Sequence, residues 1–152
     1  GIKFGSDTAA ANALDDYEEG SFDPTVFGSA STGSSSYGNR SGRYVKIGKL
    51  VTCHVYINWT SADGTGNLQI GGLPFAVDND TTSDGLQQAG PVMSNNISFP
   101  SGHQSGSYLV THAWYGINYV RIYACGHDTG WSAVQVDSSG SFIFTVTYSA
   151  ST

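Results

Sequence analysis

The sequence predicts an all-β protein, an antiparallel β-sandwich or jelly-roll-like fold built from roughly eight to ten short strands. Apolar and polar residues alternate with period two in many stretches, as in strands that bury one face. Turn-forming clusters separate these stretches, and the 152 residues include 20 glycines. Charged residues make up 12% of the chain and aromatic residues another 12%, a composition that favours strands over long helices. The length suits one domain, which we place at residues 14–152.

The first segment, residues 1–13, is small and polar, and its alanines form the only helix-friendly run. A short helical turn and an extended lead-in from an upstream shaft or linker both fit this composition. The chain begins with Gly rather than Met, so we expect a fragment, a trimmed product or a designed chain.

Residues 14–24 carry five of the twelve acidic residues, namely Asp15, Asp16, Glu18, Glu19 and Asp23. Clustered carboxylates suggest a glycosidase, which uses two carboxyl groups about 5 to 10 Å apart. Ion pairing is the stronger interpretation, because four of the six Lys and Arg residues fall within residues 40–49. We expect pairs within or between chains, which contribute more to how subunits dock than to stability.

The strongest strand pattern lies at residues 43–59 and predicts a β-hairpin, with Gly48 and Lys49 as its two-residue turn. On its second strand one side is apolar and should face the core. The residues on that side are Val51, Cys53, Val55, Ile57 and Trp59. Before the hairpin, residues 25–27 predict a short strand, and residues 29–41 predict a loop or a ragged edge strand.

After the hairpin, residues 67–70 predict a strand that ends at Gly71. Pro74 should lie at a strand edge or just outside a strand, because it has no N–H to donate. The acidic segment 78–85 loosely resembles a calcium loop, but its spacing departs from that of an EF-hand, so we expect a solvated loop.

Five further strands are predicted in the second half, at residues 90–100, 107–115, 117–125, 132–136 and 142–148. In the third of these, Val120, Ile122 and Ala124 form the core side. The opposite side is a tyrosine-rich outer face that carries Arg121. The last strand is apolar enough to be central in the sheet or buried at a subunit contact.

Several classes of function are disfavoured. The net charge of -6 argues against nucleic acid, whose phosphates need a cationic surface. No apolar run approaches the ~20 residues of a membrane-spanning helix, so we expect no membrane insertion. Gly-x-Ser-x-Gly, phosphate-binding loops and Cys-x-x-Cys are missing from the sequence, and we expect neither catalysis nor a cofactor.

The cysteines and histidines are interpreted as structural. Cys53 and Cys125 are expected to be small buried side chains that pair only if their strands are neighbours. Four histidines could supply a metal site on a threefold axis, but isolated strand histidines are usually only polar, and we expect no metal. They are His54, His103, His112 and His127.

Three motifs in order carry a family resemblance. They are Leu-Asp-Asp-Tyr-Glu-Glu-Gly at 14–20, Ser-Gly-Arg-Tyr-Val-Lys-Ile-Gly-Lys-Leu-Val at 41–51, and Ile-Gly-Gly-Leu-Pro-Phe at 70–75. The first half of the chain therefore resembles the C-terminal receptor-binding tip domain of tailed-bacteriophage tail fibre proteins, and the second half resembles it only in character.

The resemblance implies a homotrimer of β-sandwiches, intertwined or side by side, at the tip of a fibre. Such a protein is made in the cytoplasm of the host bacterium and becomes part of the virion. It implies contacts with other tail proteins through an N-terminal region, and a receptor that is a bacterial surface glycan or an outer-membrane protein.

Sugar binding requires aromatic faces that stack on pyranose rings and polar groups that bind hydroxyls, usually on loops at one end of a rigid scaffold. The second half offers such residues near strand ends and turns. They are His103, Tyr108, Trp114, Tyr115, His127, Asp128 and Trp131. Burial in the core or at a subunit contact explains the two tryptophans equally well.

We therefore expect non-catalytic attachment to a bacterial surface polysaccharide. The alternatives are a virion decoration or fibre-shaft domain without its own receptor, and a polysaccharide depolymerase.

Overall fold

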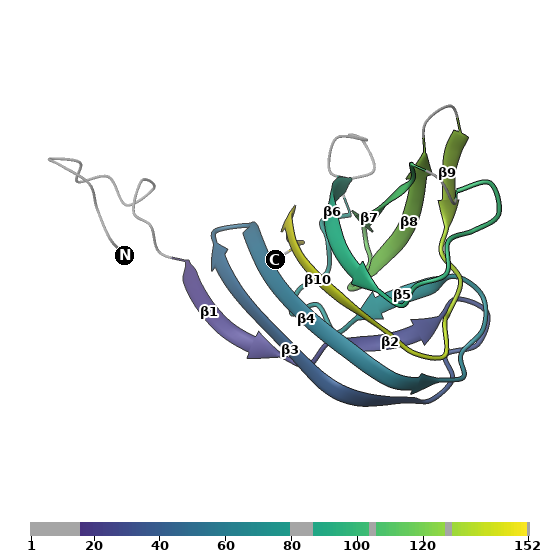
Figure 1. Cartoon of the computed structure of the whole chain (residues 1–152). Helices are drawn as coiled ribbons and strands as arrows, with labels where there is room; N and C mark the ends of the chain where they lie inside the picture. Colours follow the sequence, from purple (N-terminus) through teal and green to yellow (C-terminus); the bar gives the residue numbers. More distant parts are fainter. Residues whose placement is uncertain (1–15, 80–86, 104–105, 127–128, 152) are drawn as a thin grey trace, which may run out of the picture.

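The described part of the chain consists of ten β-strands and contains no helix (Figure 1). The computed structural model describes residues 16–79, 87–103, 106–126 and 129–151, so the predicted lead-in at 1–13 lies outside the described residues. No helix that could cross a lipid bilayer occurs in the described segments. The strands are β1 (Tyr17–Phe22), β2 (Thr25–Gly28), β3 (Ser35–Ile47), β4 (Leu50–Ala62), β5 (Leu68–Gly71), β6 (Gln88–Asn95), β7 (Tyr108–Ala113), β8 (Val120–Gly126), β9 (Thr129–Ala133) and β10 (Gly140–Ser149).

The strands form one antiparallel sheet, and β6 connects its two halves. Residues 88–91 of β6 pair with β7, whereas residues 92–95 pair with β10. The first half-sheet has the order β1-β3-β4-β10-β6, and the second has the order β6-β7-β8-β5-β2, with β9 also paired to β8. Figure 1 shows the sheet curled so that its halves face each other. The predicted all-β antiparallel fold is confirmed.

The predicted hairpin at residues 43–59 forms the centre of the first half-sheet. Gly48 has a φ of 58°, and Ile47 pairs with Leu50 across the turn, so the two-residue turn is confirmed. Each of the five residues predicted to face the core from β4 is at most 3% exposed. The apolar last strand, β10, is central in the sheet, between β4 and β6.

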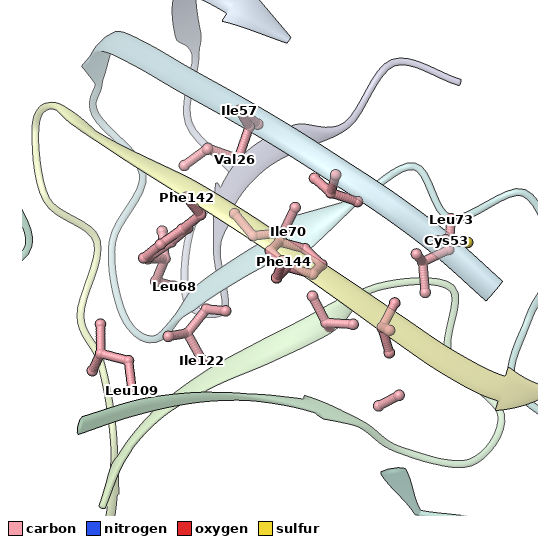
Figure 2. Packing of buried hydrophobic residues seen from close by; sticks show 14 of the residues in the cluster. Val26, Cys53, Ile57, Leu68, Ile70, Leu73, Leu109, Ile122, Phe142 and Phe144 are labelled. Atoms are coloured by element: carbon pink, nitrogen blue, oxygen red, sulfur yellow. The ribbon is translucent and has the colours of Figure 1, made fainter. Parts of the chain in front are cut away.

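The core fills the space between the half-sheets. Figure 2 shows Phe142 and Phe144 of β10 and Ile57 of β4 packed near side chains of β5 and β8, among them Ile70 and Ile122. Burying each such side chain contributes about 1.5–3 kcal/mol to stability. The indole ring of Trp59 on β4 is also held in position, because its Nε1 donates a hydrogen bond of 2.9 Å to the carbonyl oxygen of Asp137. Both half-sheets therefore depend on one shared core.

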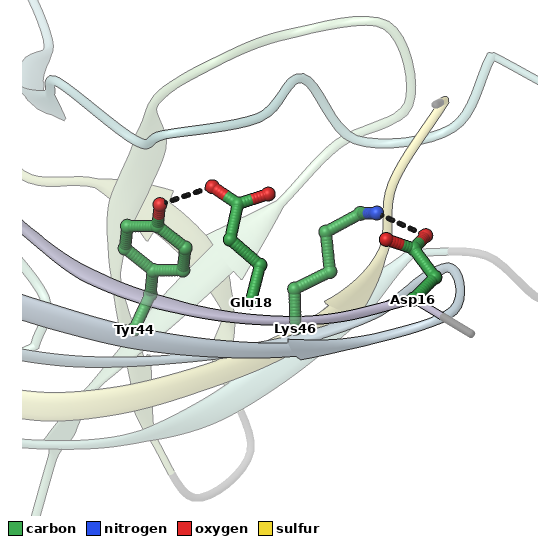
Figure 3. A network of polar contacts seen from close by, with 4 residues as sticks. All are labelled: Asp16, Glu18, Tyr44 and Lys46. Atoms are coloured by element: carbon green, nitrogen blue, oxygen red, sulfur yellow. Dashed lines mark hydrogen bonds and ion pairs between the residues drawn. The ribbon is translucent and has the colours of Figure 1, made fainter. Parts of the chain in front are cut away.

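Residues 17–22, within the acidic segment 14–24, form edge strand β1, whose charges conceal the alternation of a strand. This strand pairs with β3, and Figure 3 shows two polar contacts to β3, one from Glu18 of β1 and one from Asp16 just before it. Lys46 Nζ donates to Asp16 Oδ2 at 2.5 Å, and the Tyr44 hydroxyl donates to Glu18 Oε1 at 2.5 Å. Lys46 is only 5% exposed, and the carboxylate of Asp16 offsets the free-energy cost of burying its charge.

Two more ion pairs join basic residues of the segment 40–49 to acidic residues. Arg40 lies 3.7 Å from Asp23, and Lys49 lies 3.2 Å from Asp78. The predicted ion pairing is thus confirmed within one chain. Asp78, the first residue of the predicted solvated loop 78–85, is held by its ion pair with Lys49. Most of that loop lies outside the described residues.

Other expectations differ in detail. The polar segment 29–41 is partly strand, because residues 35–41 belong to β3 and pair only with β4, with register shifts around Tyr37. The ragged edge strand was the right alternative. The strand predicted from residue 117 begins at Val120. Cys53 and Cys125 are both free, because Cys53 faces the core and Cys125 lies on the outer side of β8.

Candidate functional site

The outer face of the second half-sheet is built by strict alternation in β7 and β8. Leu109, Thr111 and Ala113 of β7 are buried, as are Val120, Ile122 and Ala124 of β8. The residues between them therefore point outward. The register of β7 and β8 decides which outward side chains are neighbours: His112 pairs with Arg121, and Val110 pairs with Tyr123. The predicted core side of residues 117–125 and its outer face are confirmed.

A groove of about 350 Å³ runs over this face. Two tryptophans close it, Trp114 just after β7 and Trp131 on β9. Ala89 on β6, which pairs with His112, contributes a small side chain to the lining. We call this feature the aromatic groove, and its lining residues are Ala89, Val110, His112, Trp114, Arg121, Tyr123 and Trp131.

Aromatic rings in the groove contact one another in sequence. The ring of His112 lies 5.2 Å from Trp114 and 5.6 Å from Tyr123, both nearly perpendicular to it. Tyr123 in turn lies 6.2 Å from Trp131. These spacings match those of favourable aromatic pairs. Trp131 is nevertheless 78% exposed, so its indole face is available to a ligand.

The electrostatics of the groove are set by one cation. The guanidinium carbon of Arg121 lies 5.2 Å from the centre of the Trp114 ring, in a cation–π contact. Burial lowers the pKa of His112, and the charge of Arg121 lowers it further. His112 is therefore neutral at pH 7. Its Nε2 lies 3.0 Å from Gln87 Oε1, an oxygen that only accepts, which leaves Nδ1 as an acceptor.

The structure brings Trp114 and Trp131 together in the groove and places Tyr115 and Tyr108 beside it. Tyr115 contacts the Trp114 ring at 5.0 Å but does not line the groove. Tyr108 is 60% exposed on the same outer face, next to the groove.

The histidines and the aspartate of the predicted site are placed differently. His103 is buried, and its Nε2 lies 2.7 Å from the carbonyl oxygen of Gly130. This contact joins His103 to the start of β9, and His103 is not among the lining residues of the groove. His127 and Asp128 lie outside the described residues.

Sequence reasoning missed His112, Arg121 and Tyr123 as site residues. It assigned them to strand faces and looked for the site among loops, and it placed Trp131 in a turn, whereas this residue is inside β9. The tyrosine-rich outer face with its arginine was the available signal. What the sequence could not show is the register that places His112 beside Arg121.

Two further hollows lie on the outer side of the first half-sheet, around Arg43 and His54. The hollow lined by Glu19, Tyr44 and His54 is larger than the aromatic groove, about 490 Å³, and its lining is more polar. In the other hollow, His54 Nδ1 lies 3.0 Å from the Thr145 hydroxyl. Among the described residues, no group of three or more His, Cys, Asp or Glu side chains is arranged to hold a metal ion.

Comparison with known proteins finds a likeness in fold. No protein-family model matches the sequence, and no curated protein sequence matches it. The structure is similar to part of the crystal structure of the Dettilon tailspike protein, with a TM-score of 0.64 and 20% sequence identity. The similarity covers 88% of this chain and 24% of that one, so the chain corresponds to about a quarter of the tailspike.

Proposed function

We propose that this chain is a bacteriophage tail protein of the fibre or tailspike kind, which attaches the virion to a polysaccharide on the bacterial surface. Two independent observations support a phage tail protein. One is the set of motifs that resembles tail fibre tips, and the other is the fold similarity to a tailspike. The aromatic groove carries the proposal of glycan binding.

The groove has the components of a sugar site. Pyranose rings present C–H faces that stack on indole and phenol rings, and Trp131 offers such a face to solvent. Tyr123, His112 and Arg121 add hydrogen-bonding groups beside it. The whole set stands on paired strands, which hold it more rigidly than loops do.

Binding proceeds without cleavage in this proposal. Glycosidases require two carboxyl groups around the scissile bond, and none of the described lining residues of the groove is Asp or Glu. The depolymerase alternative predicts release of reducing ends from any polysaccharide that the protein binds. Detection of such ends would overturn the non-catalytic assignment.

The experiment measures binding of the chain to a printed panel of bacterial capsular and lipopolysaccharide glycans. We expect binding that falls about 5- to 150-fold in Trp131→Ala, since loss of one stacked aromatic ring costs about 1–3 kcal/mol. Tyr108→Ala is the matched control, because Tyr108 is exposed on the same face but outside the groove. A folded wild-type protein that binds no glycan would instead support a shaft or decoration domain.

Assembly into a homotrimer belongs to the same proposal, and an exposed apolar face supports it. Six of the eight large apolar side chains that the described residues expose lie on the outer face of the first half-sheet. Register groups them in two clusters, Tyr17 with Ile47 and Leu50, and Tyr56 with Ile143 and Met93. Further copies of the chain are the proposed cover, because the same face carries Glu19 and Arg43, which two copies can pair.

Light scattering tests the assembly. We expect a mass near three times 16.0 kDa and dissociation in Ile143→Glu, which places a charge at the centre of the second cluster. A monomeric wild-type protein would overturn the trimer and leave glycan binding to be judged on the panel.

A further inference from the structure

Arg121 is the exceptional residue of the aromatic groove. It is the only Lys or Arg after residue 49, and it lies on a surface that is otherwise aromatic, apolar or neutral. The surrounding second half-sheet therefore offers an anion a single cationic contact, inside the groove.

The charge of Arg121 has no carboxylate partner among the described residues. Within the described ranges, Arg40, Lys46 and Lys49 each lie within 4.0 Å of an acid, whereas Arg121 and the exposed Arg43 do not. Burial alone lowers the pKa of Arg121, but the neighbouring hydroxyl groups of Tyr119 and Tyr123 more than offset that effect, and the guanidinium stays charged. The π face of Trp114 attracts this cation. It does not act as a hydrogen-bond acceptor for the five N–H groups, which are arranged in a planar fork.

The half-buried guanidinium of Arg121 has five N–H donors, more than the hydroxyl groups of Tyr119 and Tyr123 can occupy. Its planar fork matches a carboxylate, which accepts two parallel N–H···O bonds. The remaining walls match a sugar ring, with the indole of Trp131 as a stacking face and Nδ1 of His112 as an acceptor for a hydroxyl. The volume of about 350 Å³ is at the small end of ligand sites and suits about one or two rings.

We propose that the aromatic groove recognises an acidic sugar, a pyranose of the hexuronic acid type whose carboxylate pairs with Arg121 while its ring stacks on Trp131. This inference rests on the proposed glycan-binding function and specifies its ligand class. Because the protein has a net charge of -6, long-range electrostatics repel an acidic polymer. Recognition depends on the local contact with Arg121.

The test uses two small probes that differ only at the carboxylate, methyl glucuronide and methyl glucoside. Their binding is followed by the indole N–H signals of the three tryptophans in two-dimensional NMR spectra of the whole chain. Trp59 is the internal control, because its Nε1 is bonded inside the protein to Asp137. We expect millimolar glucuronide to shift the signals of Trp114 and Trp131, and the glucoside to bind about tenfold more weakly.

Arg121→Gln should remove this preference and weaken glucuronide binding about tenfold, while the Trp59 signal stays in place. Arg40→Gln is the matched control, since Arg40 is an exposed arginine on the other half-sheet that, like Arg121, lies over an aromatic ring. Equal binding of both probes, an unchanged preference in Arg121→Gln, or no shift with either probe would overturn the acidic-sugar proposal. The proposed function fails by a different result, the absence of binding to every polysaccharide on the panel.

Discussion

The hydroxyl of Tyr148 donates a hydrogen bond of 2.9 Å to the carbonyl oxygen of Phe75. Tyr148 is in β10 and is buried, whereas Phe75 lies in the segment after β5. Residues 72–76 around it belong to no strand. This bond therefore ties an irregular piece of backbone to the centre of the sheet.

Tyr148→Phe should lower the free energy of unfolding by about 1–2 kcal/mol, because it leaves the half-buried carbonyl of Phe75 without this donor. Urea denaturation measures the change. Tyr108→Phe is the control, and its exposed hydroxyl should contribute less than about 0.5 kcal/mol. Equal stability of Tyr148→Phe and the wild type would show that water replaces the bond.

The two cysteines should differ sharply in reactivity. Burial raises the pKa of Cys53 to about 11, more than the hydrogen bond with Tyr148 lowers it, and the residue is 0% exposed. Burial also raises the pKa of Cys125, which lies half-buried on the outer side of β8. At pH 8.5, iodoacetamide should modify Cys125 in the folded protein and reach Cys53 only in urea.

Mass spectrometry of the labelled peptides distinguishes the two sites, and Cys125→Ser should abolish labelling of the folded protein. A Cys53–Cys125 disulfide under non-reducing conditions would contradict the opposite orientations of these side chains.

Stability should depend on pH through His112. The pKa of His112 is lowered in the folded chain, first by burial and then by Arg121. At a pH below about 6.5, the ordinary pKa of histidine, His112 therefore binds more protons in the unfolded chain than in the folded one. The free energy of unfolding therefore falls as the pH drops below about 6.5, until the folded pKa is reached.

The test compares wild type with His112→Gln in urea titrations at pH 7.5 and 5.5. Other titrating groups are common to both proteins, so the wild type should lose more stability than the variant over this interval. The same loss in both proteins would show that His112 is protonated as readily in the folded chain as in the unfolded one.

Local pattern predicted the elements whose two sides differ. The hairpin at 43–59 could be predicted from the sequence because every second residue of β4 is apolar and buried, from Val51 to Trp59. Strand β1 was not readable, because an edge strand exposed to water can carry Glu18 and Glu19 without cost. Its position depends on pairing with β3, a contact that no pattern within residues 17–22 specifies.

The candidate site was predicted only in part for a similar reason. Trp114 and Trp131 were identified as aromatic residues suited to sugars, and the structure places both in one groove. Arg121 joins them through its register with His112 and through the position of β9 beside β8. Such long-range pairing is set by the whole core rather than by local residues.

The position of β10 has a consequence for synthesis on the ribosome. This strand follows the other nine described strands in the chain, yet it lies between β4 and β6, and Cys53 pairs with Val146. The hairpin of β3 and β4 can form early from local contacts, but one side of β4 then remains unpaired until residues 140–149 are made. A nascent chain that pauses before this point presents an open apolar edge to its neighbours, so slow translation should favour aggregation.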